Sequence, residues 1–341
     1  MKKRILIILA LILTVLMGCE RRELEYGSAV IDLKLKINLN VRVNGKITNL
    51  PTPEMMRVMF FDPKTYELVT ESYLPAGGGR ISLPPGDYKF IGYNFDTEAT
   101  LLRNDRNYYT IEAYTNEVSA AMKASILSAI RQGRSEAKTP DADAWELAIK
   151  KIQEGEVIYE PDHLFVSHQD ITVLNTTEEQ VIEADAETIV ETWHISVRIK
   201  NEQYLASARA LLTGQIASNF IGLPKEEGKT NTDVTLMFDM TAGTDDEKND
   251  VVVGTFNTFG KNPNVESRLW LTIIIKTVGG DSIIWQRDIT DDFYTPDAIT
   301  DQVINIVEEI TIPPPSTPTT GSGGFQPGVD DWDVENVPIN I

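Results

Sequence analysis

The 341-residue chain contains one cysteine, Cys19, and three histidines, His163, His168 and His194. A single cysteine excludes an internal disulfide, so burial of apolar side chains must stabilise the fold. A zinc site needs several convergent ligands, and cysteine cannot contribute a cluster of them here. His163 and His168 lie in a strand-like segment at a spacing that would point them to opposite faces, so we predict no metal site.

The chain is also poor in basic residues, with 31 Lys plus Arg against 51 Asp plus Glu and a formal net charge of −20. This charge repels nucleic acid, so we predict no nucleic-acid partner. The sequence holds neither a Gly-x-Ser-x-Gly elbow nor a phosphate-binding loop. We therefore predict that the protein is not an enzyme and uses no cofactor; a hydrolase is the weakest alternative.

The amino terminus lacks an apolar run long enough for a membrane-spanning helix, which needs about 20 residues. The uncharged run Ile5–Met17 follows three basic residues, as in a secretory signal peptide. Leu16-Met17-Gly18-Cys19 resembles a bacterial lipobox, in which the cysteine thiol receives a diacylglyceryl group. We predict a signal peptide at 1–18, lipidation of Cys19 and a tether at 19–28. The alternative is an ordinary secreted protein with a chance cysteine.

The first fold signal is an unbroken alternation of apolar and polar residues from Ile31 to Val43. A period of two predicts a strand with one buried and one solvated face. The apolar members of this predicted strand are Ile31, Leu33, Leu35, Ile37, Leu39, Val41 and Val43.

Short strand patterns separated by turn residues continue through a predicted first domain at 29–178. Arg57–Phe61 and Glu67–Leu74 flank Asp62-Pro63-Lys64, which predicts a hairpin. Strands at this spacing favour an antiparallel β-sandwich.

Between about 114 and 153 the periodicity becomes helical, with two amphipathic segments that end at Gly133 and Gly155. We expect this helical insertion to cover an open edge or face of the β domain. A helical arm that binds a partner is the alternative.

The segment 179–312 predicts a second β-sandwich. Leu269–Ile275 is almost continuously apolar, as expected for a central strand covered on both faces. Asn201–Leu212 shows a weak helical periodicity. Trp193, Trp270 and Trp285 lie in strand patterns and are predicted core residues.

A Pro- and Gly-rich linker and an acidic, strand-like tail make up 313–341. Val337, Ile339 and Ile341 alternate at its end, so this segment is a candidate exchange strand. The acidic residues lack the spacing of a calcium loop, and we interpret them as solvated charge. They are Asp330, Asp331, Asp333 and Glu335 in the tail, and Asp245, Asp246 and Glu247 in a loop.

Four stretches together resemble the fimbrillin-like lipoproteins of Bacteroidales, in particular the minor fimbrial anchor and accessory subunits. They are "MGCERREL" at the lipid site, "LPPGDYKFIGYN", "VVVGTFNTFG" and the terminal "GFQPGVDDWDVE". The resemblance implies two tandem transthyretin-like antiparallel β-sandwich domains and an outer-membrane lipid anchor. It also implies assembly into fimbriae by strand donation, in which the tail strand of one subunit fills a groove on its neighbour.

In that family, polymerising subunits lose their first strand to an arginine-directed protease, whereas anchor subunits keep theirs. Arg42 is the single arginine in Ile31–Val43 and is therefore the candidate protease site.

We therefore predict a non-catalytic, lipid-anchored cell-surface protein, a fimbrial anchor or accessory subunit that assembles by β-strand complementation. Its predicted partners are outer-membrane lipid, bound through Cys19, and other fimbrillin-like subunits. The alternative is a surface glycan-binding lipoprotein, with a glycan or host ligand stacked on an exposed aromatic residue such as Trp332.

Overall fold

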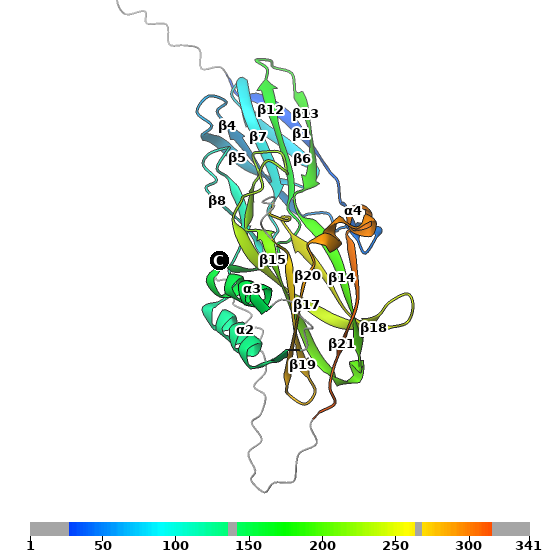
Figure 1. The fold of residues 1–341 in the computed structure, drawn as a ribbon. Helices are drawn as coiled ribbons and strands as arrows, with labels where there is room; N and C mark the ends of the chain where they lie inside the picture. Colours follow the sequence, from blue (N-terminus) through cyan, green and yellow to red (C-terminus); the bar gives the residue numbers. More distant parts are fainter. Residues whose placement is uncertain (1–26, 136–141, 263–267, 316–341) are drawn as a thin grey trace, which may run out of the picture.

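The computed structural model describes residues 27–135, 142–262 and 268–315. The described residues are mostly β, with several sheets and few helices. A seven-stranded sheet occupies one end of the elongated molecule and a nine-stranded sheet the other (Figure 1). Within the described residues, no helix is both long and apolar enough to cross a membrane.

The seven-stranded sheet has the order β5-β4-β7-β12-β13-β1-β6. Its strands are β1 (Ala29–Ile37), β4 (Met55–Phe61), β5 (Leu68–Pro75), β6 (Gly78–Leu83), β7 (Gly86–Asn94), β12 (Phe165–Val173) and β13 (Gln180–Thr188). The predicted hairpin is confirmed as β4 and β5, and the Asp62 carboxylate accepts hydrogen bonds from the backbone N–H groups of Lys64 and Thr65.

This sheet folds over a single apolar core. β12 and β13 pair at only two positions, Phe165 with Thr188 and Val166 with Glu187, so the sheet opens there into two halves. Side chains from all seven strands then pack together in one cluster, including Leu33 of β1 and Phe90 of β7. The two halves therefore face each other across buried apolar residues, as the faces of a sandwich do.

The second sheet has the order β10-β20-β19-β15-β17-β18-β14-β21, and β11 pairs with β17 beside this path. Its strands are β10 (Arg134–Ser135), β11 (Val157–Tyr159), β14 (Glu191–Lys200), β15 (Leu205–Ile216), β17 (Asp233–Thr244), β18 (Asp250–Thr258), β19 (Trp270–Thr277), β20 (Ser282–Asp288) and β21 (Val303–Thr311). Trp193, Trp270 and Trp285 are buried in it, as predicted.

The expectation of purely antiparallel sheets is corrected at four strand pairs. β1–β13, β14–β21, β10–β20 and β11–β17 are parallel. Parallel neighbours need long crossover connections, and each of these pairs joins strands far apart in the sequence.

Two helices cover one face of the nine-stranded sheet (Figure 1). They are α2 (Ala120–Gln132) and α3 (Ala142–Glu154), and they end at the predicted Gly133 and Gly155. The Ser119 hydroxyl caps α2 by accepting the Met122 N–H at 3.1 Å. The helices bury Ile126, Ile130 and Ile152 against sheet residues such as Ile274 of β19.

The helices therefore cover a sheet face, as expected, but that sheet is the second one. The chain leaves the seven-stranded sheet after β7, forms α2, β10, α3 and β11 against the other sheet, and returns in β12 and β13. The predicted boundary at 178 falls between β12 and β13, which belong to the same sheet.

β19 is the predicted doubly covered strand: Ile274 faces the helices and Ile273 faces the opposite core. The weak helical periodicity at Asn201–Leu212 does not correspond to an α-helix. After a short 3-10 turn at Glu202–Tyr204, these residues form β15, whose backbone pairs with both β17 and β19.

A three-stranded sheet lies where the two large sheets meet. It consists of β8 (Thr100–Arg103), β9 (Glu112–Thr115) and β16 (Ser218–Phe220). The cluster behind it draws residues from both sides, including Phe61 of β4 and Ile216 of β15. Two further short elements, the 3-10 turn Asp291–Tyr294 and α4 (Pro296–Asp301), precede β21.

Candidate strand-exchange site

The predicted first strand lies inside the seven-stranded sheet and is hydrogen-bonded along both edges. β1 pairs in parallel with β13, from Ile31 opposite Gln180 to Ile37 opposite Ala186. On its other edge it pairs antiparallel with β6, from Ala29 opposite Leu83 to Lys34 opposite Gly78. Removal of β1 would therefore expose two strand edges at once.

The alternation read from the sequence holds over β1. Ile31 and Leu33 are fully buried, Leu35 is 7% exposed, and Val30 on the opposite face is 43% exposed. The buried side chains share their cluster with Phe60 and Phe90. The side chains that pack against β1 are therefore apolar, and β1 contacts them with every second residue.

On the solvent face, an ion pair joins β1 to β13. The Lys36 ammonium lies 2.7 Å from the Glu183 carboxylate on β13. This hydrogen bond and the attraction between the two charges lower the pKa of Glu183 and raise the pKa of Lys36. Both side chains are largely exposed, so the pair aids register more than stability.

The prediction of one strand from Ile31 to Val43 is wrong in its second half. β1 ends at Ile37, and Asn40–Val43 forms a separate strand, β2, which pairs with β3 (Lys46–Asn49) in a two-stranded sheet. Leu39 packs at the edge of the β1 core, Val41 is buried, and Val43 is partly exposed.

Arg42 lies within this β2–β3 hairpin, opposite Ile47. Its guanidinium donates to the carboxylate of Asp301, the last residue of α4, at 2.7 Å. The Gly45 N–H of the same hairpin donates to the Asp301 carbonyl oxygen at 3.3 Å. The candidate protease site is therefore held in paired backbone beside the second sheet.

The other predicted site residues, Cys19, Val337, Ile339 and Ile341, lie outside the described residues. So do the acidic set of the tail and Trp332.

Among the described residues, no group of three or more His, Cys, Asp or Glu side chains is placed to hold a metal ion. His163 lies before β12, outside the strand, so the alternation of strand faces does not place it opposite His168. In the loop at 245–249, Asp245 and Glu247 bind Arg198 at 3.3 and 2.6 Å, so their charges are partly neutralised within the chain.

Sequence reasoning missed a polar network at the junction of the two sheets. The His163 ring nitrogens contact the hydroxyls of Thr188 and Thr192 at 3.1 and 3.0 Å. Thr192 donates to the Asn257 side-chain oxygen at 2.8 Å, and the Asn257 N–H donates to Glu160 at 2.9 Å. Scattered Thr, Asn and Glu residues give no periodic signal, so only the fold brings these groups together.

Burial controls the two titratable groups of this network. It lowers the pKa of His163 to about 4, with a smaller effect of the nearby Lys225 charge in the same direction. It raises the pKa of Glu160 to about 7, although the Asn257 N–H opposes the shift. Asp239 and Asp162 raise the Glu160 pKa further by charge repulsion.

The chain is similar to proteins that are named as fimbrial anchor subunits and adhesins. A Bacteroides ovatus protein named "Putative fimbrium anchoring subunit Fim4B" is 23% identical, with 96% of each chain covered. A crystal structure described as "a putative adhesin from Bacteroides ovatus" superposes with a TM-score of 0.59 at 21% identity, covering 88% of this chain and 99% of that one. The fimbrial anchor protein Mfa2 from Porphyromonas gingivalis gives a TM-score of 0.43 at 9% identity, with 82% of this chain and 90% of that chain covered.

The resemblance read from the sequence is thereby confirmed: the chain is similar to fimbrial anchor and adhesin proteins of Bacteroidales. The family itself is shown separately. A family model described as "Domain of unknown function (DUF5119)" matches residues 18–239, more than half of the chain, so the protein belongs to that family.

Proposed function

We propose that this protein is a lipid-anchored fimbrial anchor or accessory subunit at the outer surface of the cell, and that it assembles by β-strand complementation. The two sheets would then be the tandem transthyretin-like domains of such a subunit. Its partners would be outer-membrane lipid, through Cys19, and other fimbrillin-like subunits. The similarity to a protein named as a fimbrium anchoring subunit along 96% of both chains supports this assignment.

The observation that carries the proposal is the position of β1. A strand that is paired on both edges and buried on one face is the kind of element that strand exchange replaces. Because β1 comes from the amino-terminal end of its own chain, this subunit arrives with its groove already filled.

A filled groove suits an anchor, which ends a polymer rather than extending it. Cleavage after Arg42 would release β1, but a protease needs the scissile segment extended and unpaired. Arg42 instead lies in the β2–β3 hairpin with its guanidinium on Asp301. We propose that the native protein keeps β1, and that its free strand is the tail segment Val337–Ile341.

The test is co-purification of fimbrial subunits from cells that express tail variants. Deletion of Phe325–Ile341 should abolish co-purification while both sheets stay folded. Val337→Asp with Ile339→Asp should do the same, because charges on the apolar face cannot enter a groove. Asn340→Ala, on the other face of the predicted strand, is the matched control. If fimbrial subunits still co-purify after the deletion, the tail is not the donated strand.

The lipid is tested separately by mass spectrometry of the native protein. We expect a mature chain that starts at an acylated Cys19 and still contains β1. A start at Val43, or an unmodified Cys19 thiol, contradicts the anchor assignment.

A further inference from the structure

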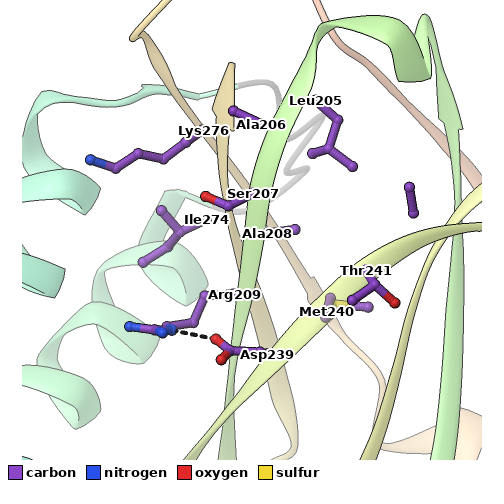
Figure 2. A pocket seen from close by; sticks show the side chains of 11 residues that line it. Leu205, Ala206, Ser207, Ala208, Arg209, Asp239, Met240, Thr241, Ile274 and Lys276 are labelled. Atoms are coloured by element: carbon purple, nitrogen blue, oxygen red, sulfur yellow. Dashed lines mark hydrogen bonds and ion pairs between the residues drawn. The ribbon is translucent and has the colours of Figure 1, made fainter. Parts of the chain in front are cut away.

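The strands β15 and β17 diverge and leave a cleft in the nine-stranded sheet. β15 and β17 pair with each other over Ala208–Ile216 and Asp233–Met240. The start of β15, Leu205–Ser207, pairs with β19 and not with β17. The end of β17, Thr241–Thr244, pairs with β18 and not with β15. Between these edges lies an opening of ≈ 620 Å³, the β15–β17 cleft, lined by Leu205–Ala208 and Met240–Ala242 (Figure 2). Leu205–Ser207 and Thr241–Thr244 each have one strand edge that faces the cleft. In the described part of the chain, no strand pairs with either of these two edges.

The cleft has two chemically different sides (Figure 2). Leu205, Ala208 and Met240 point to one side, where the apolar core of the sheet begins. On the other side lie Lys276 and the ion pair of Arg209 with Asp239, 2.7 Å apart. Lys276 and Arg209 thus place two basic side chains on that side, in a chain of net charge −20.

The described chain ends close to the cleft. A Cβ atom added to Gly279, in the turn after β19, would lie 3.0 Å from the Pro315 Cβ. Thr277, two residues before that turn glycine, pairs with Leu205 at the rim of the cleft. At about 3.3 Å per strand residue, Pro315 therefore lies roughly 10 Å from the opening.

The tail beyond Pro315 contains a segment in which acidic and apolar residues alternate, which matches the basic and apolar sides of the cleft. In Asp331–Glu335, Trp332 and Val334 alternate with Asp331, Asp333 and Glu335. As a strand, this segment presents an apolar face and an acidic face. The residues before it, Ser316 to Asp330, can span up to about 50 Å when extended, so reach does not limit docking.

We propose that Asp331–Glu335 of the same chain adds to the sheet as a strand in the β15–β17 cleft. Trp332 and Val334 lie against Leu205, Ala208 and Met240, and the carboxylates lie toward Lys276. Backbone groups of Thr241–Thr244 gain partners, which is the usual reason for strand addition at an open edge. Docking is intramolecular, so it proceeds at a high effective concentration.

This inference goes beyond the proposed function, because it concerns residues before the terminal segment. A docked Asp331–Glu335 would leave Val337–Ile341 projecting from a fixed point on the second sheet.

Hydrogen–deuterium exchange of the full chain tests the docking. The backbone amides of 241–244 should exchange about tenfold more slowly in the wild type than in a Trp332→Asp, Val334→Asp variant. Val337→Asp with Ile339→Asp is the matched control and should keep the protection, even if it abolishes partner binding. Equal exchange in the wild type and the Trp332, Val334 variant overturns the proposal.

A paired-cysteine experiment identifies the occupant. Ala242→Cys and Val334→Cys are combined in a Cys19→Ser chain, which contains no other thiol. Oxidation should give a cross-linked monomer on a non-reducing gel. A cross-linked dimer would assign the cleft to the tail of a second copy, and no cross-link would leave it to another partner; either result overturns docking within one chain.

Discussion

Gly78 shows how closely the backbones approach at the candidate site. Its φ of +95° lies in a region that favours glycine, and a Cβ placed there would meet the Leu33 carbonyl oxygen at 1.9 Å. That oxygen belongs to β1, so the contact cannot be relieved by turning a flexible side chain. The neighbouring Gly77 has nothing within 4 Å of an added Cβ.

Gly78→Ala should therefore destabilise the protein by at least about 2 kcal/mol, because strain at positive φ adds to a backbone clash. Gly77→Ala should change the free energy of unfolding by less than about 0.5 kcal/mol, as is usual for a surface substitution. Urea denaturation of both variants measures the difference. Equal stability of the two would mean that β1 is not held against Gly78 in solution.

At the scale of the element, the alternation of the sequence predicted the buried face of β1 but not its end. The apolar–polar period continues through Asn38 and Leu39, so periodicity alone cannot show that the chain changes sheets there. The missed signal was Asn44-Gly45, where both residues have positive φ, 47° and 70°. An Asn-Gly pair between β-prone residues is a hairpin signal, and it predicts that Val43 turns back rather than continuing.

Helix prediction failed at Asn201–Leu212 for a related reason. The spacing of its apolar residues fits a weak helix, but pairing with two neighbouring strands satisfies the same backbone groups and buries Leu211 and Leu212 on opposite faces. Tertiary contacts of this kind override local propensity, and they involve residues far away in the sequence.

The β2–β3 hairpin gives a prediction about proteolysis. Asp301→Ala removes the partner of Arg42, in a partly exposed ion pair worth about 0.5–1 kcal/mol. Opening of the hairpin becomes correspondingly easier, so an arginine-specific protease should release the fragment that starts at Val43 about two- to fivefold faster.

The matched control is Asp291→Ala, an exposed acidic residue in the 3-10 turn before α4. Time courses with mass spectrometry follow the fragment. A rate in Asp301→Ala no faster than in the control would show that the ion pair does not protect this bond.

At the scale of the whole molecule, the sequence indicated two β regions but not how the chain is shared between them. The segment with α2 and α3 interrupts the seven-stranded sheet and packs on the other, because its apolar face fits the surface around Ile274 and Ile284. Such a crossing leaves no trace in composition. The chain passes the junction again before β12 and after β13, where His163 and Thr192 meet.

The junction predicts how stability depends on pH. The folded protein raises the pKa of Glu160 from 4.5 to about 7, so the folded state holds a proton that the unfolded chain releases at lower pH. This contribution to stability is fully present below pH 4.5 and is lost as the pH rises through about 7. His163 acts in the opposite direction: its pKa falls from 6.5 to about 4, so its contribution is present above pH 6.5 and is lost as the pH falls through about 4.

Glu160→Gln isolates the carboxylate, because glutamine keeps an oxygen for the Asn257 N–H and cannot ionise. Relative to this variant, the wild type should lose about 2 kcal/mol of unfolding free energy between pH 5 and pH 8, a figure reduced from the full shift because the site is partly solvated. Asp246→Asn, in the exposed loop at 245–249, is the control and should follow the wild type at every pH. Urea denaturation across the pH range measures all three proteins. The unfolding free energies of the wild type and Glu160→Gln could instead differ by the same amount at pH 5 and pH 8. Glu160 would then not titrate between these pH values, and it would not make the packing of the two sheets depend on pH.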